Sequence, residues 1–170
     1  MQDPFFSSSV IFICEHNNDG AMGLMINKQF KEPKLGKLFE QLYIGDNVIT
    51  SLVQDIYFGG PVMLERGIVL HSAEFSTEGT ISISDEFSMT SQKTVLQELK
   101  SQNKTPYKLI LGHAGWEAKQ LEREIENGDW LIQSTTVDFV FNISSDQMWQ
   151  HAAGSLGVDL GSFSGVGGQA

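Results

Sequence analysis

The stretch DPFFSSSVIFICEHNNDGAMGLMIN, residues 3–27, says most about the fold of this chain. Residues 10–13 form a continuous apolar run rich in β-branched side chains, which is typical of a strand buried on both faces. Residues 17–20 supply turn chemistry, and residues 21–26 predict a return strand. The segment is therefore predicted to be a β-hairpin that contributes to the core.

Apolar periodicity places the other elements. Strands are predicted at residues 55–58, 67–71, 80–84, 107–111, 130–133 and 137–141. Helices are predicted around four apolar stripes, which consist of Leu35, Leu38, Phe39 and Leu42; of Val95, Leu96 and Leu99; of Ala118, Leu121 and Ile125; and of Met148, Trp149, Ala152, Ala153 and Leu156. Expected helix boundaries are an N-cap at Thr90, an end at Gly128, and a last start at Ser145 or Asp146. Because strands and helices do not alternate strictly, an α+β fold is expected.

Composition and charge limit the function classes. The 170 residues carry a net charge of −10 and a single cysteine, so neither an internal disulfide nor general attraction to a nucleic-acid duplex is expected. No signal peptide or membrane-spanning segment is predicted, which favours a cytoplasmic protein without membrane contact. Lys28, Lys31, Lys34 and Lys37 recur every third residue. They form either a small anion-binding face or a solvated loop that leads into a helix.

Cys14 and His16 are the first candidates for chemistry. If the strand continues, the two side chains share one face while Glu15 points away. A neighbouring imidazolium lowers the pKa of a thiol, which would suit a nucleophile or a redox sensor. The alternative is that Cys14 is a small buried hydrophobe at the end of a core strand.

Two further histidines and a glycine pair are candidates for binding. His71 and His113 also follow apolar strands, so with His16 and Cys14 they could gather at one rim and hold a metal, although their spacings match no zinc pattern. Gly59 and Gly60 could present backbone N–H groups to an anion, or form only a structural turn. We therefore expect no metal and no cofactor.

The segment around residues 116–130 combines acidic and aromatic residues. Its carboxylates, Glu117, Glu122, Glu124 and Glu126, could serve acid–base chemistry, but on the outer face of a helix they more often provide solvation. The tryptophans Trp116, Trp130 and Trp149 are interpreted as core anchors and not as a stacking platform.

Particular motifs resemble the bacterial YqgE/AlgH family. They are Asp3-Pro4-Phe5-Phe6, Ser9-Val10, Cys14-Glu15-His16-Asn17, Gly20-Ala21-Met22-Gly23 and Asn27; Gly59-Gly60-Pro61-Val62, Arg66-Gly67 and Leu70-His71; Gly112, Ala114-Gly115-Trp116, Gln120-Leu121-Glu122, Glu124 and Trp130; and Gly157-Val158-Asp159. Three features differ from the family pattern. A strand of roughly 10 residues before Asp3 is missing, His113 replaces a tyrosine, and the tail ends in Gln169-Ala170 where the family has His-Ala.

The resemblance implies an α+β fold in which a branched, mostly antiparallel sheet curls into a pseudo-barrel with about four flanking helices. It implies one domain over residues 1–156 and a Gly-rich irregular tail over 157–170. Family members are largely uncharacterised, and some are called transcriptional regulators. We therefore expect a non-enzymatic regulatory or interaction protein whose partner is a protein or a small molecule. The alternatives are a thiol-dependent enzyme or redox sensor that uses Cys14, and a ligand-binding pseudo-barrel.

Overall fold

The computed structural model describes residues 8–29, 56–91, 95–102 and 104–155. The strands are β1 (Ile11–Asn17), β2 (Gly20–Met25), β3 (Ile56–Phe58), β4 (Val62–Ser72), β5 (Thr80–Ser82), β6 (Phe87–Thr90) and β7 (Tyr107–Glu117). The helices are α3 (Val95–Gln102), α4 (Gln120–Glu126), α5 (Val137–Asn142) and α6 (Ser145–Ser155). Among these helices, none is both long and apolar enough to span a membrane.

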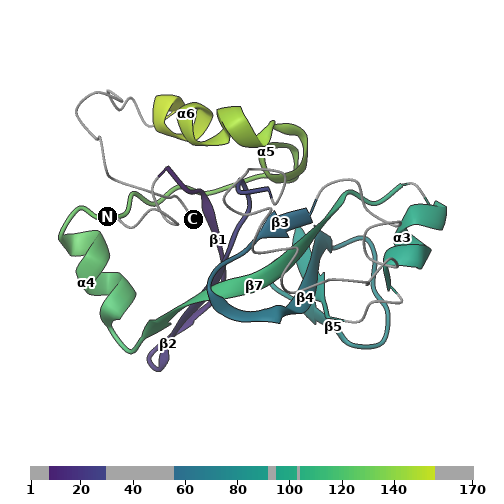
Figure 1. The fold of residues 1–170 in the computed structure, drawn as a ribbon, viewed down its shortest axis with the longest axis horizontal. Coiled ribbons are helices and arrows are strands. Elements are labelled where there is room, and N and C mark those ends of the chain that lie inside the picture. The colour runs from purple at the N-terminus through teal and green to yellow at the C-terminus, as the bar shows by residue number, and fades with distance from the viewer. Residues whose placement is uncertain (1–7, 30–55, 92–94, 103, 156–170) are drawn as a thin grey trace.

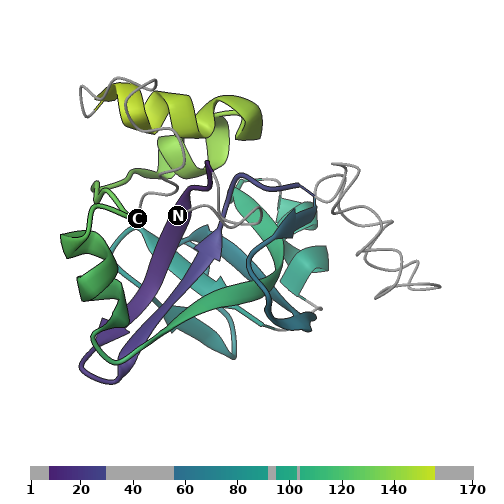
Figure 2. The ribbon, with the colours of Figure 1, turned by 60° about the vertical axis from the view of Figure 1, so that its left-hand side comes forward.

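Strand β7 organises the sheet. The strand order is β1-β2-β7-β4-β6-β5, and β3 pairs with β7 as a branch from this path. The β3–β7 pair is parallel, whereas the other strand pairs of the described residues are antiparallel. The sheet curls into a half-barrel with the helices around it (Figures 1 and 2). The expectation of an α+β fold built on a branched, mostly antiparallel sheet is confirmed.

The first hairpin forms as predicted but contains a bulge. Ile13 lies opposite Gly23 and Glu15 opposite Met22, so Cys14 is left out of the register. A bulge shifts the side-chain alternation by one residue. Phe12 and Cys14 pack in one hydrophobic cluster and Ile13 in another, and after the bulge His16 lies on the same side as Ile13.

Three hydrophobic clusters lie between the sheet and its helices. The largest joins β1, β2, β4 and β7 to α5 and α6 through Val140 and Met148. The second packs Leu121 of α4 against the β1–β2 hairpin and the end of β7. The third places Val95, Leu96 and Leu99 of α3 against β4 and β7, as their spacing predicts. Figures 1 and 2 show α3, α4 and the α5–α6 pair at three separate places around the sheet.

Several predicted elements are wrong. Residues 137–141 lie in helix α5 because Thr136 caps it, its Oγ1 accepting from the Phe139 N–H at 3.2 Å. Thr90 caps no helix and ends β6, a strand that the pattern analysis missed. Residues 130–133 form no strand beyond a bridge at Leu131, and Ala118 is exposed since α4 begins only at Gln120. The predicted helix at 35–42, residues Lys31, Lys34 and Lys37, and the tail at 157–170 fall outside the described residues.

Candidate functional site

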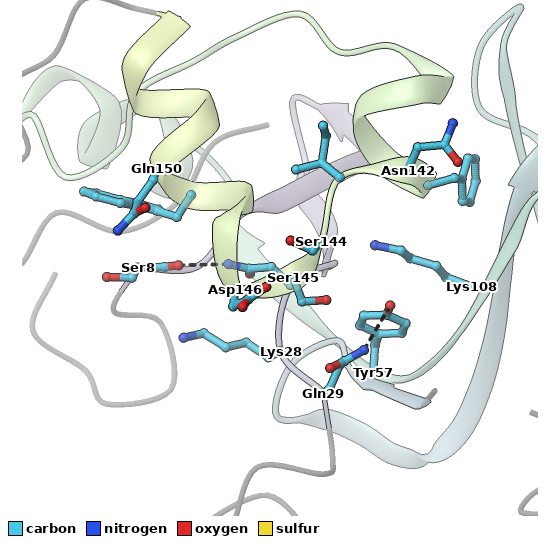
Figure 3. A pocket seen from close by; sticks show the side chains of 14 residues that line it. Ser8, Lys28, Gln29, Tyr57, Lys108, Asn142, Ser144, Ser145, Asp146 and Gln150 are labelled. Atoms are coloured by element: carbon cyan, nitrogen blue, oxygen red, sulfur yellow. Dashed lines mark hydrogen bonds between the residues drawn. The ribbon is translucent and has the colours of Figure 1, made fainter. Parts of the chain in front are cut away.

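A cleft of about 850 Å³ lies between the α5–α6 region and one end of the sheet. We call it the α6 cleft. Figure 3 shows side chains from segments far apart in the sequence pointing into it. They come from the chain after β2, from Tyr57 of β3, from Lys108 of β7, and from residues 141–150.

Lys108 is the central cation of the α6 cleft. The residue is only 6% exposed, although it lines the cleft. Its ammonium Nζ donates to the Ile26 carbonyl oxygen at 2.9 Å and lies 4.5 Å from the centroid of the Tyr57 ring. A carbonyl dipole and a ring face stabilise a buried cation without neutralising it. These two contacts hold the Lys108 ammonium in the wall of the cleft.

Hydrogen bonds fix the chain on the sheet side of the cleft. The Asn27 side chain donates from Nδ2 to the Ser8 carbonyl oxygen at 3.0 Å and accepts at Oδ1 from the Val10 N–H at 2.8 Å. Gln29 Nε2 donates to the Tyr57 hydroxyl at 3.3 Å (Figure 3). Because Asn27, Gln29 and Tyr57 are buried, the wall that carries Lys28 is held in place.

The opposite wall is the junction of α5 and α6. Asn142 Nδ2 donates to Asp138 Oδ1 at 2.8 Å, one turn back along α5, and this pair stabilises the helix. Ser144 precedes α6, and its carbonyl accepts from the Gln147 N–H at 3.1 Å. The first turn of α6 thus borders the cleft through Ser145 and Asp146. A helix N-terminus carries partial positive charge on its backbone N–H groups.

The charge of the α6 cleft is opposite in sign to that of the whole chain. Among the described residues that line it, the charged ones are Lys28, Lys108 and Asp146, whose formal charges sum to +1, whereas the complete sequence carries −10. Hydroxyl and amide groups surround these charges. The arrangement is suited to binding an anionic polar molecule, and the lining residues that the structure describes include no nucleophile paired with a base.

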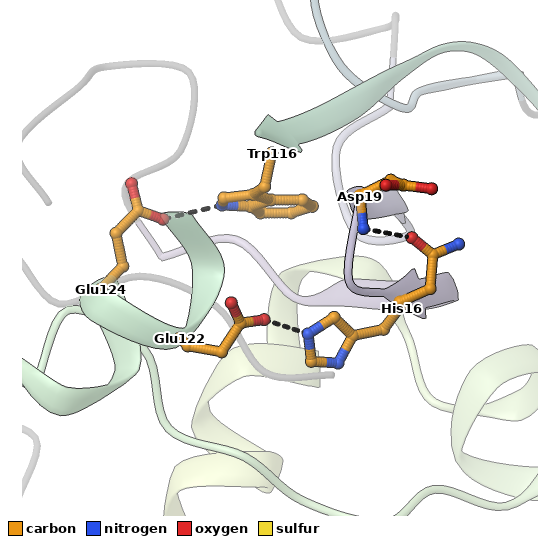
Figure 4. Close-up of polar contacts among 6 residues, drawn as sticks. His16, Asp19, Trp116, Glu122 and Glu124 are labelled. Carbon is orange, nitrogen blue, oxygen red and sulfur yellow. Dashed lines mark hydrogen bonds and ion pairs between the residues drawn. The ribbon is translucent and has the colours of Figure 1, made fainter. Parts of the chain in front are cut away.

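Cys14 and His16 do not form a catalytic pair. Because of the bulge, Cys14 packs in the cluster beneath α5 and α6 while His16 faces α4, so the expectation that they share a face is wrong. His16 Nε2 instead bonds Glu122 of α4 (Figure 4). Burial raises the pKa of Cys14 to about 12, and the adjacent Glu15 carboxylate adds to the rise. This environment favours a neutral, unreactive thiol.

His71 and His113 are also separated from each other. His71 lies opposite Tyr107 at one end of β7, and His113 lies opposite Val62 six residues further along, about 20 Å away. The histidines therefore do not gather at one rim, and the alternative of a shared metal site has no support from their positions. Within the described ranges, no group of three metal-binding side chains occurs.

His71 has a structural environment. It is fully buried, with Nδ1 donating to the Ser72 carbonyl at 2.9 Å and Nε2 accepting from the Thr90 hydroxyl at 2.9 Å. A carbonyl can only accept, so the proton lies on Nδ1. Burial lowers the pKa of His71, which keeps the ring neutral. Burial, with a contribution from the nearby Arg66 cation, also lowers the pKa of His113.

Gly59 and Gly60 occupy a tight crossing between strands. The Gly59 N–H donates to the Leu111 carbonyl at 2.8 Å, and its carbonyl accepts from the Met25 N–H at 2.9 Å. Gly60 has φ +151°, and a Cβ atom there would overlap the backbone of His113. The backbone of Gly59 is thus hydrogen-bonded to both β2 and β7, which agrees with the interpretation of this glycine pair as a structural turn.

Glu124 differs from the expected solvated carboxylate. Its Oε2 accepts from Trp116 Nε1 at 2.7 Å and from Trp130 Nε1 at 3.0 Å, and its Oε1 accepts from Gln120 Nε2 at 3.3 Å. The two indole rings meet edge to face, with centroids 6.1 Å apart. We call this arrangement the indole clamp. Both tryptophans are core residues, as predicted.

The sequence contained one signal for the α6 cleft that pattern analysis missed. Lys108 is the charged residue within residues 107–111, the apolar run that predicts a buried strand and forms the first part of β7. Charged side chains are rarely buried without partners, so a lysine in such a run marks a special environment. Its contact with Tyr57, however, depends on the parallel pairing of β3 with β7, which local patterns do not reveal.

Comparisons with known proteins agree with the fold and the motifs. The AlgH-like family model (DUF179) matches residues 1–161. A UPF0301 protein of Pseudoalteromonas translucida is 37% identical over 172 residues, covering 100% of this chain and 92% of that protein. The solution structure of the AlgH protein from Pseudomonas aeruginosa has a TM-score of 0.72 at 36% identity, covering 95% of this chain and 86% of that one. A crystal structure of a Corynebacterium diphtheriae protein has the same fold, with a TM-score of 0.64 at 22% identity, covering 89% and 79%. With its motifs, its half-barrel and these matches in agreement, the chain belongs to the AlgH-like family.

Proposed function

We propose that the protein is a non-enzymatic cytoplasmic regulatory protein that binds a small anionic molecule in the α6 cleft. The observation that carries this proposal is the pair Lys28 and Lys108 in one polar cleft of a strongly acidic chain. Concave sites with a few convergent polar groups are the usual form of small-molecule sites. Carboxylates and phosphates are the anions that lysine and a helix N-terminus bind.

The ligand is expected to be small and to carry its charge at one end. Lys108 and the first turn of α6 would surround the charged group, and Tyr57 and Asn142 would provide hydrogen bonds to the remainder. Asp146 limits the net positive charge, which disfavours a polyanion as long as a nucleic acid. Binding would join the α5–α6 region to the sheet, because the cleft has walls on both.

Titration with inorganic phosphate and with citrate tests the proposal. Backbone amide resonances of residues 142–146 and of residues 27–29 are expected to shift together and to saturate. Replacing Lys28 with Met should weaken binding by about tenfold or more, since a hydrogen bond to a charged group contributes about 1.5–3 kcal/mol. The matched control is Lys100→Met, which removes an exposed lysine of α3 outside the cleft.

Lys108→Met is the second variant. It removes the central cation and also the bond to the Ile26 carbonyl, so its folded fraction must be measured first by circular dichroism. The proposal is refuted if neither anion shifts the cleft resonances, or if Lys28→Met and Lys100→Met bind with equal affinity. Because Lys28 is only partly buried, the Lys28 result does not depend on the stability of the core.

If the protein regulates transcription, we infer that it acts through a protein partner. The net charge of −10 opposes approach to a duplex, which requires clustered cations that neutralise phosphates. Fluorescence anisotropy with a labelled random duplex at physiological salt is expected to detect no binding. Submicromolar binding in this assay would refute the inference.

A further inference from the structure

A second pocket lies beneath α4, on the other side of the β1–β2 hairpin from the α6 cleft. It has a volume of about 250 Å³, and we call it the α4 pocket. Its floor includes Ile11 and Ile13 of β1, and Leu121 and Ile125 of α4 form one side. Of the lining residues in the described part of the chain, His16 alone is ionisable. The pocket is therefore apolar with a single polar edge.

The indole clamp builds the aromatic wall of this pocket. Trp116 and Trp130 line it, and both of their N–H groups are bonded to Glu124. Figure 4 shows Glu124 and Trp116 joined in this way. The clamp fixes the orientation of both rings and satisfies their only polar atoms. The rings thus offer pre-positioned apolar surface to an occupant of the pocket.

The edge of the pocket carries the contact between His16 and Glu122. Both side chains are partly exposed, and they join the β1–β2 hairpin to α4 (Figure 4). Ile132 lies on the lining too and is 60% exposed, so it places apolar surface at the mouth of the pocket. An apolar group in the pocket would cover part of this surface.

We propose that the α4 pocket binds a small neutral aromatic molecule of about the size of indole. An apolar cavity of about 150 Å³ accommodates benzene, so one of 250 Å³ accommodates a bicyclic ring. The two indoles present faces and edges for offset or edge-to-face stacking. A charged ligand would lose its hydration among apolar side chains, while a single polar atom could bond His16 at the edge.

A protein partner fits this surface less well. A stable protein interface buries about 800 Å² on each side around an apolar centre. The exposed large hydrophobic residues of the described chain are Val62, Met63, Ile81 and Ile132, and only Ile132 lines this pocket. The outer surface of α4 beside it carries charged residues. The site is thus a pocket in a charged surface, which suits a small molecule.

Titration of the whole protein with indole tests the proposal, with isoleucine δ1 methyl groups as NMR probes. Ile13, Ile125 and Ile132 are expected to shift in a saturable manner, while Ile81 on β5 serves as the internal control that stays unchanged. Nine ligand heavy atoms should give a dissociation constant of about 1 mM or tighter. Indole-3-acetate should bind more weakly, because its carboxylate meets an apolar pocket beside Glu122.

Two variants connect the binding to the pocket. Ile125→Trp fills the space from α4 and should abolish saturable shifts, and Ile132→Asp should weaken binding several-fold from an exposed position that does not affect folding. Ile81→Trp is the matched control and should leave binding unchanged. The proposal is overturned if indole shifts all isoleucine methyls without saturation, or if Ile132→Asp binds as the wild type does. It is also overturned if an apolar peptide, and not indole, shifts the pocket methyls. These outcomes are independent of phosphate binding in the α6 cleft.

Discussion

Replacing Glu124 with Leu removes the acceptor of the indole clamp. The Trp116 and Trp130 N–H groups would each lose a hydrogen bond, at 2.7 and 3.0 Å, while their rings stay buried with exposures of 8% and 5%. Leucine fits a helix and adds apolar volume, so the main effect is the loss of the carboxylate. The variant therefore measures what the clamp contributes to stability.

The expected magnitude follows from the two orphaned donors. A buried donor without a partner destabilises the folded state by about 1–3 kcal/mol. Because Glu124 itself is only partly buried, water can reach the vacated position, and the lower half of this range applies. We expect a loss of about 3 kcal/mol for Glu124→Leu, or about 6–12 °C in Tm for a chain of this size. Glu124→Gln keeps an acceptor oxygen and should lose about 1 kcal/mol.

Urea unfolding followed by circular dichroism gives these free energies. Glu126→Leu is the matched control, because Glu126 lies on the same helix, is exposed, and lines the open surface beside α4. It should change the free energy of unfolding by no more than about 0.5 kcal/mol. In a double-mutant cycle with Trp130→Phe, the coupling with Glu124→Leu should exceed about 1 kcal/mol. A Glu124→Leu variant as stable as the control, or a coupling near zero, would refute the clamp.

Three further predictions concern the other buried groups. Burial raises the pKa of Cys14 to about 12, so the thiolate fraction at pH 8 is about 10⁻⁴. Iodoacetamide should therefore alkylate the folded protein far more slowly than the urea-unfolded chain, and equal rates would contradict this. The pKa of His71 is lowered by burial, so the unfolded chain takes up a proton that the folded chain excludes, and stability should fall as pH drops below about 6.5, by up to 1.4 kcal/mol per pH unit. Urea unfolding between pH 7 and 5 should show a shallower fall for His71→Gln, and identical slopes would sink the idea. Gly60→Ala should destabilise the fold by about 3 kcal/mol or more, because the added Cβ meets the His113 backbone. Gly154→Ala, which adds a Cβ in open space on α6, should instead stabilise it by about 0.5 kcal/mol. Both are measured by thermal unfolding, and a Gly60→Ala variant with the wild-type Tm would rule out the close crossing.

The fold was predictable where one local pattern dominates. The apolar run at residues 10–13, the turn at 17–20 and the stripe Val95, Leu96, Leu99 each predict an element that the structure contains. The strand predicted at residues 137–141 was wrong because an apolar run over so few positions fits a strand as well as a short helix. The hydrogen bond from the Phe139 N–H to Thr136 Oγ1 caps the segment as a helix. The sequence alone does not show this, because a threonine can precede an apolar run in a strand as well as in a helix.

The candidate sites were less predictable because they depend on tertiary contacts. The α6 cleft combines Asn27, Tyr57, Lys108 and Asn142, which no sequence spacing relates. Glu124 looked like one of several surface carboxylates until the tryptophans eight positions before and six positions after it were found to converge on one oxygen. The alternative that Cys14 packs against the core agrees with its place beside the largest hydrophobic cluster, whereas no local pattern indicated Lys108 as a site residue.

The bulge at Cys14 explains why the two sides of the hairpin differ in chemistry. Without it, Glu15 would lie opposite Ala21 and face α4, where Glu122 would repel it. With it, His16 takes that position and bonds Glu122, while Glu15 moves to the other side. One inserted residue thus replaces a like-charge contact by a favourable one and completes the edge of the α4 pocket. The thiol that looked reactive in the sequence therefore has a geometric role: its backbone sets the phase of the strand, and its side chain fills the core.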